Sequence, residues 1–159
     1  MTVDRYARDR AAQLLRNLIS GKATNDEFED SVPPTSDRAV LAIWDTAWVL
    51  YDDRKEHVLS GRYRLTADMR RICVRWLLFL HSNHEYEWPD LCLPGIDPAT
   101  RTEPSFWQRL FHLPQRLLTP QMAAEFLAAG HYPVWPFISK SDYRQALRKP
   151  RLLSGFRSQ

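Results

Sequence analysis

The residues best suited to chemistry lie in the stretch HSNHEYEWPDLC, from His81 to Cys92, which holds two histidines, three acids and a cysteine. If a helix continued past His81, then His84 and Glu85 would share its face. The order H-x-x-H-E nevertheless differs from the H-E-x-x-H and H-x-x-E-H arrangements of zinc proteases, and no other run supplies a Glu-x-x-His pair for a dinuclear site. We therefore predict no metal ion here and favour a helix end, where the helix dipole stabilises histidine.

The segment EYEWP within this stretch is a candidate binding surface. Glu85 and Glu87 alternate with Tyr86 and Trp88, so the segment could offer negative charge and aromatic area together, as protein interfaces often do. The alternative is that the two aromatic side chains cover the helix end while the two acids face water. The sequence leaves both interpretations open.

Asp45 is a second candidate, because it lies between Trp44 and Trp48 in the most apolar helical segment. A carboxyl group beside indole rings can have a raised pKa, which suits proton transfer. Its register with Leu41 and Asp52 favours a solvated or salt-bridged acid instead. Asp45 and Trp48 are accordingly predicted as binding residues, and no catalytic residue is assigned.

The usual cofactor and nucleophile motifs are missing from the sequence. There is no G-x-S-x-G, and five glycines form neither a Walker loop nor a dinucleotide fingerprint, so no cofactor is expected. The two cysteines, Cys73 and Cys92, lie far apart in the sequence. Two cysteines with this spacing form neither a zinc knuckle nor a disulfide framework. The N-terminal residues MTVDRYARDR lack the apolar run of a signal peptide, and no stretch approaches the roughly 20 residues that span a bilayer. We expect a cytoplasmic protein without membrane association.

Helical spacing in the first 90 residues predicts the elements that position these candidates. A helix over 4–20 ends at Gly21, and a short helix follows Thr24 or Asn25. Ser36 is the predicted cap of a helix over 37–51, and Thr66 that of a helix over 67–81. The three long helices are expected to share one core, to which the following side chains contribute: Trp44, Trp48, Trp76, Leu77 and Leu80.

The second half of the chain differs, because nine of the eleven prolines lie at or after Pro89. Helices remain plausible over 104–113, 120–130 and 141–149. With 159 residues and 44% apolar residues, the chain has the size and composition of one globular domain. The predicted fold is all-α: a helical core over 1–90, Pro-rich short helices over 91–139 that wrap it, and a basic tail over 140–159.

The tail carries most of the excess positive charge. Residues 1–90 hold 13 basic and 15 acidic residues, whereas residues 91–159 hold 9 basic and 4 acidic ones. Such a segment can bind phosphate groups weakly through electrostatic attraction. The residues that would do so are Lys140, Arg144, Arg148, Lys149 and Arg151.

Three stretches, LISGKATNDEFED, IWDTAWVLYDD and EYEWP, resemble a group of small bacterial proteins without an assigned function. The resemblance covers about the first 90 residues. It implies a bacterial source and brings no activity, cofactor or site residue.

The leading hypothesis is a non-enzymatic helical interaction protein, such as an immunity or antitoxin-like partner of another bacterial protein, or a homo-oligomer. It rests on the 19 aromatic residues, on the uneven distribution of acidic and basic residues along the chain, and on the lack of a recognisable catalytic motif. One alternative is a small hydrolase or metal-dependent enzyme that uses acids and histidines at 81–90 with Asp45 or Asp52. Clustering of these side chains in one pocket would favour the enzyme. Weak nucleic-acid binding through the tail is the other alternative.

Overall fold

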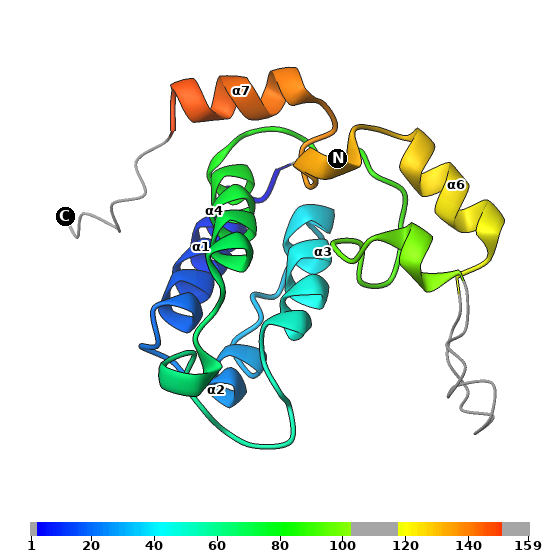
Figure 1. The fold of residues 1–159 in the computed structure, drawn as a ribbon. Helices are drawn as coiled ribbons and strands as arrows, with labels where there is room; N and C mark the ends of the chain where they lie inside the picture. Colours follow the sequence, from blue (N-terminus) through cyan, green and yellow to red (C-terminus); the bar gives the residue numbers. More distant parts are fainter. Residues whose placement is uncertain (1–2, 103–117, 151–159) are drawn as a thin grey trace, which may run out of the picture.

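The computed structural model describes residues 3–102 and 118–150, and the regular structure of this part is helical, with no strand (Figure 1). The all-α prediction is confirmed. This part also contains four short 3-10 helices: η1 (Trp48–Leu50), η2 (Gly61–Tyr63), η3 (Pro98–Arg101) and η4 (Tyr132–Val134). The α-helices are α1 (Arg5–Ile19), α2 (Asn25–Glu29), α3 (Arg38–Ala47), α4 (Ala67–His81), α6 (Pro120–Ala128) and α7 (Lys140–Arg148).

Local sequence signals account for the ends of α1, α2 and α4. Asp4 accepts a hydrogen bond from the Ala7 amide at 3.0 Å, and α1 is followed by Gly21 in the left-handed region, with φ of 71°. Thr24 and Glu27 form a capping box at α2. Thr66 accepts a hydrogen bond from the Met69 amide at 3.2 Å, which confirms it as the cap of α4.

The start and end of α3 differ from the prediction. The cap is Asp37, whose Oδ1 accepts a hydrogen bond from the Ala39 amide at 2.9 Å, so the assignment of Ser36 was wrong. Ser36 is exposed, whereas Asp37 is buried between helices and is fixed there by a second partner. The α-helix ends at Ala47 and tightens into η1 (Trp48–Leu50).

The core forms where α1 packs against α4 and α3, as predicted. Small side chains such as Ala11 and Ala12 let the helices approach, and Leu15 and Leu18 are almost fully buried. Each such leucine contributes roughly 1.5–3 kcal/mol by leaving water. Trp44 stacks on Phe28 of α2, with ring centroids 3.9 Å apart, and so closes one edge of the core.

Trp48 does not contribute to the core, contrary to the prediction, because half of its surface is exposed. The buried positions of α3 and η1 run through Val40, Ile43, Ala47 and Leu50. Trp48 lies outside this stripe, so the predicted apolar face was too broad. Trp76, Leu77 and Leu80 are buried as expected.

The second half of the chain adds large aromatic side chains to the same core. Trp135 meets Trp76 edge-on at 5.9 Å, Phe137 meets Phe79 at 4.9 Å, and Trp88 stacks on Phe126 at 4.8 Å. Figure 1 shows α6 and α7 on the outside of the α1, α3 and α4 unit, with α7 lying across one end of α4. The Pro-interrupted half therefore wraps the core, as predicted.

Arg75 fastens this second half to α4. Its Nε and Nη1 donate to the carbonyl oxygens of Trp135 and Pro133, each at 2.7 Å. The helices expected over 120–130 and 141–149 correspond to α6, with Pro120 in its first turn, and α7. The helix expected over 104–113 lies outside the described residues. Within residues 3–102 and 118–150, no helix has the length and apolar character needed to cross a bilayer.

Candidate functional site

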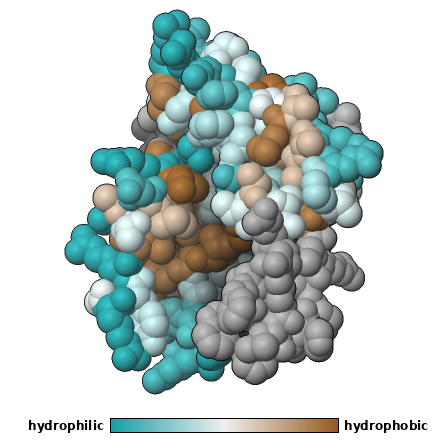
Figure 2. Space-filling model, turned by 45° about the vertical axis from the view of Figure 1, so that its right-hand side comes forward, coloured by the Kyte–Doolittle hydropathy of each residue, from teal (hydrophilic) through white to brown (hydrophobic). Residues whose placement is uncertain are grey.

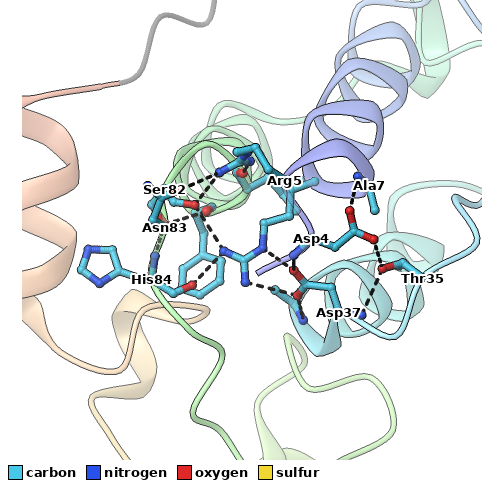
Figure 3. A network of polar contacts seen from close by, with 12 residues as sticks. Asp4, Arg5, Ala7, Thr35, Asp37, Ser82, Asn83 and His84 are labelled. Carbon is cyan, nitrogen blue, oxygen red and sulfur yellow. Dashed lines mark hydrogen bonds and ion pairs between the residues drawn. The ribbon is translucent and has the colours of Figure 1, made fainter. Parts of the chain in front are cut away.

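The stretch that begins at His81 connects the end of α4 to α1 through hydrogen bonds. Helix α4 ends at His81, and Ser82 is its C-cap with extended backbone angles, so His84 and Glu85 do not continue the helical face. The carbonyl oxygens left free at this end accept hydrogen bonds from two arginines of α1 (Figure 3). Arg5 donates to Leu80 and to Ser82, the latter at 2.7 Å, and Arg8 donates to His84 at 2.7 Å.

Arg8 also joins α1 to α3 through a buried ion pair with Asp37 (Figure 3). Arg8 Nε lies 2.7 Å from Asp37 Oδ2, and the two side chains are 1% and 4% exposed. Sequence reasoning missed this pair. A signal was present, since Arg8 falls on the buried stripe that contains Ala11 and Leu15, where an unpaired charge would be very costly.

His81 faces α1 rather than a metal site. Arg16 Nη2 contacts His81 Nε2, and His81 Nδ1 lies 3.7 Å from Asp9 Oδ1. Desolvation lowers the pKa of Arg16 from its ordinary value. Across the described part of the chain, no group of three histidine, cysteine or acidic side chains is arranged to hold a metal ion.

The aromatic residues of EYEWP are packed inward. Trp88 is fully buried, and its Nε1 donates to the carbonyl of Pro136 at 3.1 Å. Tyr86 accepts a hydrogen bond from Trp135 Nε1 at 3.2 Å, and burial raises its pKa. Glu85 and Glu87 are exposed. The arrangement matches the packing interpretation of this segment, with the acids facing water.

A concave surface that includes predicted site residues lies beside α3, and we call it the α3 groove. Its volume is about 470 Å³, within the range typical of ligand pockets. The 86–92 segment forms the opposite wall, and residues before and within α6 close it. The groove is lined by Arg38, Leu41, Ala42, Asp45, Tyr86, Pro89, Asp90, Leu91, Cys92, Arg101, Leu118 and Met122.

Two hydrogen bonds hold the segment around Leu93 and Gly95, which has no regular secondary structure, against α3. The amide of Gly95 donates to Thr46 Oγ1 at 3.1 Å, and a Cβ on Gly95 would lie 2.3 Å from Thr46 Cγ2, so only glycine fits. The amide of Leu93 donates to Asp45 Oδ2. Leu93 has a φ of 50°, a left-handed conformation that costs a non-glycine residue roughly 1–2 kcal/mol. Asp45 therefore helps to hold a strained wall of the groove.

The charged side chains at the groove form an ion pair and hydrogen bonds to backbone carbonyl groups. Arg38 Nη2 lies 2.8 Å from Asp90 Oδ1 and donates to the Trp88 carbonyl at 2.6 Å. Arg101 Nη1 donates to the carbonyls of Cys92 and Leu93 at 2.7 and 3.2 Å. Asp45 Oδ2 accepts the hydrogen bond from the Leu93 amide, and among the described residues no donor to Asp45 Oδ1 is found, so that oxygen is available to a ligand.

Several exposed hydrophobic side chains belong to the elements that line this groove or directly follow them. Among the described residues, Leu41, Trp48, Val49 and Met122 make up half of the eight large hydrophobic side chains that are exposed. Leu41 and Met122 line the groove itself, and Trp48 follows Leu41 by two helical turns on the same side of α3 and η1. Figure 2 views the molecule from the side of α6 and shows hydrophobic residues gathered in a recess.

The structure separates the other predicted residues from the groove. His81 and His84 line a different cavity, and Asp52 is exposed, with its Oδ1 accepting from the Arg54 amide at 3.0 Å. Lys140, Arg144, Arg148 and Lys149 are exposed on or just after α7, and Arg151 lies outside the described residues. Of the predicted binding residues, Asp45 and Tyr86 line the groove, whereas Trp48 is not among its lining residues. Leu91, Cys92, Arg101 and Met122 were not predicted, because they belong to segments whose positions depend on tertiary contacts.

Comparison with known proteins adds no relative: no protein-family model, curated protein or solved structure matches this chain.

Proposed function

We propose that this chain acts by binding another protein, and that the α3 groove receives a segment of that partner. The observation that carries the proposal is that exposed Leu41 and Met122 line one concave surface, while exposed Trp48 follows Leu41 by two helical turns. Contiguous apolar area of this kind is costly to leave in water, and in soluble proteins it commonly marks a binding site. Tryptophan is also enriched among the residues that dominate binding energy.

The groove favours a partner segment of defined chemistry. Its floor and edges are apolar at Leu41, Leu91 and Met122, and Asp45 offers one carboxylate oxygen next to them. An amphipathic segment with hydrophobic side chains on one face and a lysine or arginine beside them would satisfy both features. The partner is therefore expected to carry such a basic, amphipathic segment.

The enzyme alternative receives less support from the arrangement. It required the acids and histidines of residues 81–90 to share a pocket with Asp45 or Asp52. His81 and His84 instead line a second cavity whose described lining residues include neither aspartate, and no histidine is among the described residues that line the α3 groove. An immunity or antitoxin-like role is the narrower form of the binding proposal, and it makes the product of the neighbouring gene the first partner to test.

Photocrosslinking provides the test of the binding surface. A photoreactive amino acid is placed at position 48, and in a matched control at position 74, because Trp48 and Val74 are 50% and 45% exposed. In the source cells, position 48 should crosslink one partner much more strongly than position 74. The partner is then purified, and its affinity is measured for the wild type and for L41D, M122D and V74D.

L41D and M122D should weaken binding at least tenfold, because each places a charge in an apolar contact, while V74D should stay within about twofold of the wild type. Equal crosslinking from both positions, or equal loss of affinity in V74D, would show that the groove is not the interface. A crosslinked product made of two copies of this chain would replace the heterologous partner by a homo-oligomer. Circular dichroism of each variant checks that the helical fold is kept.

A further inference from the structure

A second cavity lies between the end of α4 and the end of α7, away from the α3 groove, and its volume is about 410 Å³. The residues of interest in its wall are His81, Asn83 and His84 from the α4 side and Gln145 and Lys149 from the α7 side. Among the described residues that line it, none is acidic. The cavity thus combines a cationic ammonium group with several neutral hydrogen-bond donors.

The His84 ring lines this cavity, while the His84 backbone forms hydrogen bonds with other residues. The His84 carbonyl accepts from Arg8, and the His84 amide donates to Ser82 Oγ at 3.3 Å. The ring points away from the Arg8 network, on the side where the chain of α7 runs (Figure 3). It meets the Phe137 ring edge-on, with the ring centroids 5.8 Å apart. A nitrogen of the ring can then donate a hydrogen bond to a ligand in the cavity.

Asn83 is oriented by a neighbouring arginine. Its Oδ1 accepts a hydrogen bond from Arg5 Nη1 at 3.3 Å, so the amide nitrogen is the group left for a ligand. Lys149 is exposed at the C-cap of α7 and lies at the opposite wall, with the Gln145 amide one turn before it. Donors from the segment that follows α4 and from the end of α7 therefore line one cavity.

Acidic and basic side chains both lie behind the α4 wall of the cavity. Arg5, Arg8 and Arg16 are near the carboxylates of Asp4, Asp9 and Asp37 there. His81 is engaged by Arg16 and lies near Asp9, so it contributes its ring surface to the wall. Lys149 adds a further positive charge. Glu85, which follows His84, is exposed and does not line the cavity.

We infer that this cavity binds the phosphate group of a small ligand, through Lys149, His84 and the Asn83 amide. A phosphate offers more acceptor oxygens than a carboxylate and so can use donors from both walls at once. This site is independent of the α3 groove and does not rest on the protein-binding proposal.

Titration of the full chain with inorganic phosphate at constant ionic strength, followed by the NMR signals of the His84 ring, tests the inference. The wild type should give saturable shifts. K149M and H84F should each weaken the affinity at least fivefold, and H84F keeps an aromatic ring against Phe137. The matched control K140M removes an exposed lysine at the other end of the same helix and should stay within about twofold.

A short single-stranded oligonucleotide serves as the second ligand and separates a free phosphate from a phosphate within a polymer. Binding of either ligand that depends on Lys149 and His84 but not on Lys140 supports the phosphate site. Equal losses in K149M and K140M, or equal shifts with chloride at the same ionic strength, would show general attraction to basic residues and would overturn the inference. Retained phosphate binding in L41D confirms that the two sites are separate.

Discussion

Two adjacent residues at the start of α3 form ion pairs in opposite environments. Asp37 turns inward to Arg8, and the side chains of that pair are 4% and 1% exposed. Arg38 turns outward to Asp90, whose side chain is 90% exposed, at the rim of the α3 groove. The Arg8–Asp37 pair lies where α1, α3 and the end of α4 meet, and the Arg38–Asp90 pair lies at a candidate binding surface.

The comparison shows how burial changes what an ion pair does. Arg8 and Asp37 are largely removed from water, so each polar atom depends on a protein partner, and several are supplied: Arg8 donates to His84, and the Asp4 amide donates to Asp37 Oδ2 at 3.0 Å. The loss of one member leaves a buried charge unpaired. Around Asp90, water can replace a lost partner, so the same change has a small effect on stability.

The largest effect is expected from R8M, which removes the guanidinium and keeps much of the apolar stem. Asp37 would then remain buried without its cation, and the carbonyl of His84 would lose its donor. The free energy of unfolding should fall by about 3–5 kcal/mol. Urea unfolding followed by circular dichroism measures the change. R10M, at an exposed position of the same helix, is the matched control, and an equal loss there would contradict the contrast between the two environments.

A smaller effect is expected at the outer pair. R38M removes the ion pair with Asp90 and the hydrogen bond to the Trp88 carbonyl, and should cost about 1 kcal/mol of unfolding free energy. D90N removes only the exposed charge and should cost under about 0.5 kcal/mol. The same urea measurement applies. If D90N destabilised the fold as much as R8M does, exposure would not explain the difference between the pairs.

The smallest effect concerns pH and Asp4, which lies beside the buried pair. Its pKa is lowered from 3.8, first by the hydrogen bond from the Ala7 amide and then by that from the Thr35 hydroxyl. The folded state therefore prefers the ionised carboxylate. This contribution is present above the unfolded pKa and is lost as pH falls through the folded pKa.

D4N should accordingly show a shallower loss of stability than the wild type when urea unfolding is compared at pH 5 and pH 3. D53N, which changes an exposed aspartate after η1, should follow the wild-type pH dependence. An unchanged slope in D4N would mean that the capping hydrogen bonds do not depend on the charge of Asp4.

The sequence by itself determined the helices whose signals are local. Asp4 and Gly21 bound α1, and Thr66 caps α4, because capping and periodicity depend on residues within one or two turns. The all-α class and the wrapping second half followed from the same periodicity and from the position of the prolines. The separation of Asp45 from the buried stripe of α3 was also visible in its register.

Only the tertiary structure decided which polar and aromatic residues are buried. Arg8 is buried because Asp37 and His84, which are 29 and 76 residues away in the chain, supply its partners. Trp48 is exposed because Leu50 takes the next core position as the helix tightens. The α3 groove exists because the 86–95 segment returns to α3 and is held by Thr46 and Asp45. Each of these outcomes depends on contacts between distant residues, whose energies no local pattern records.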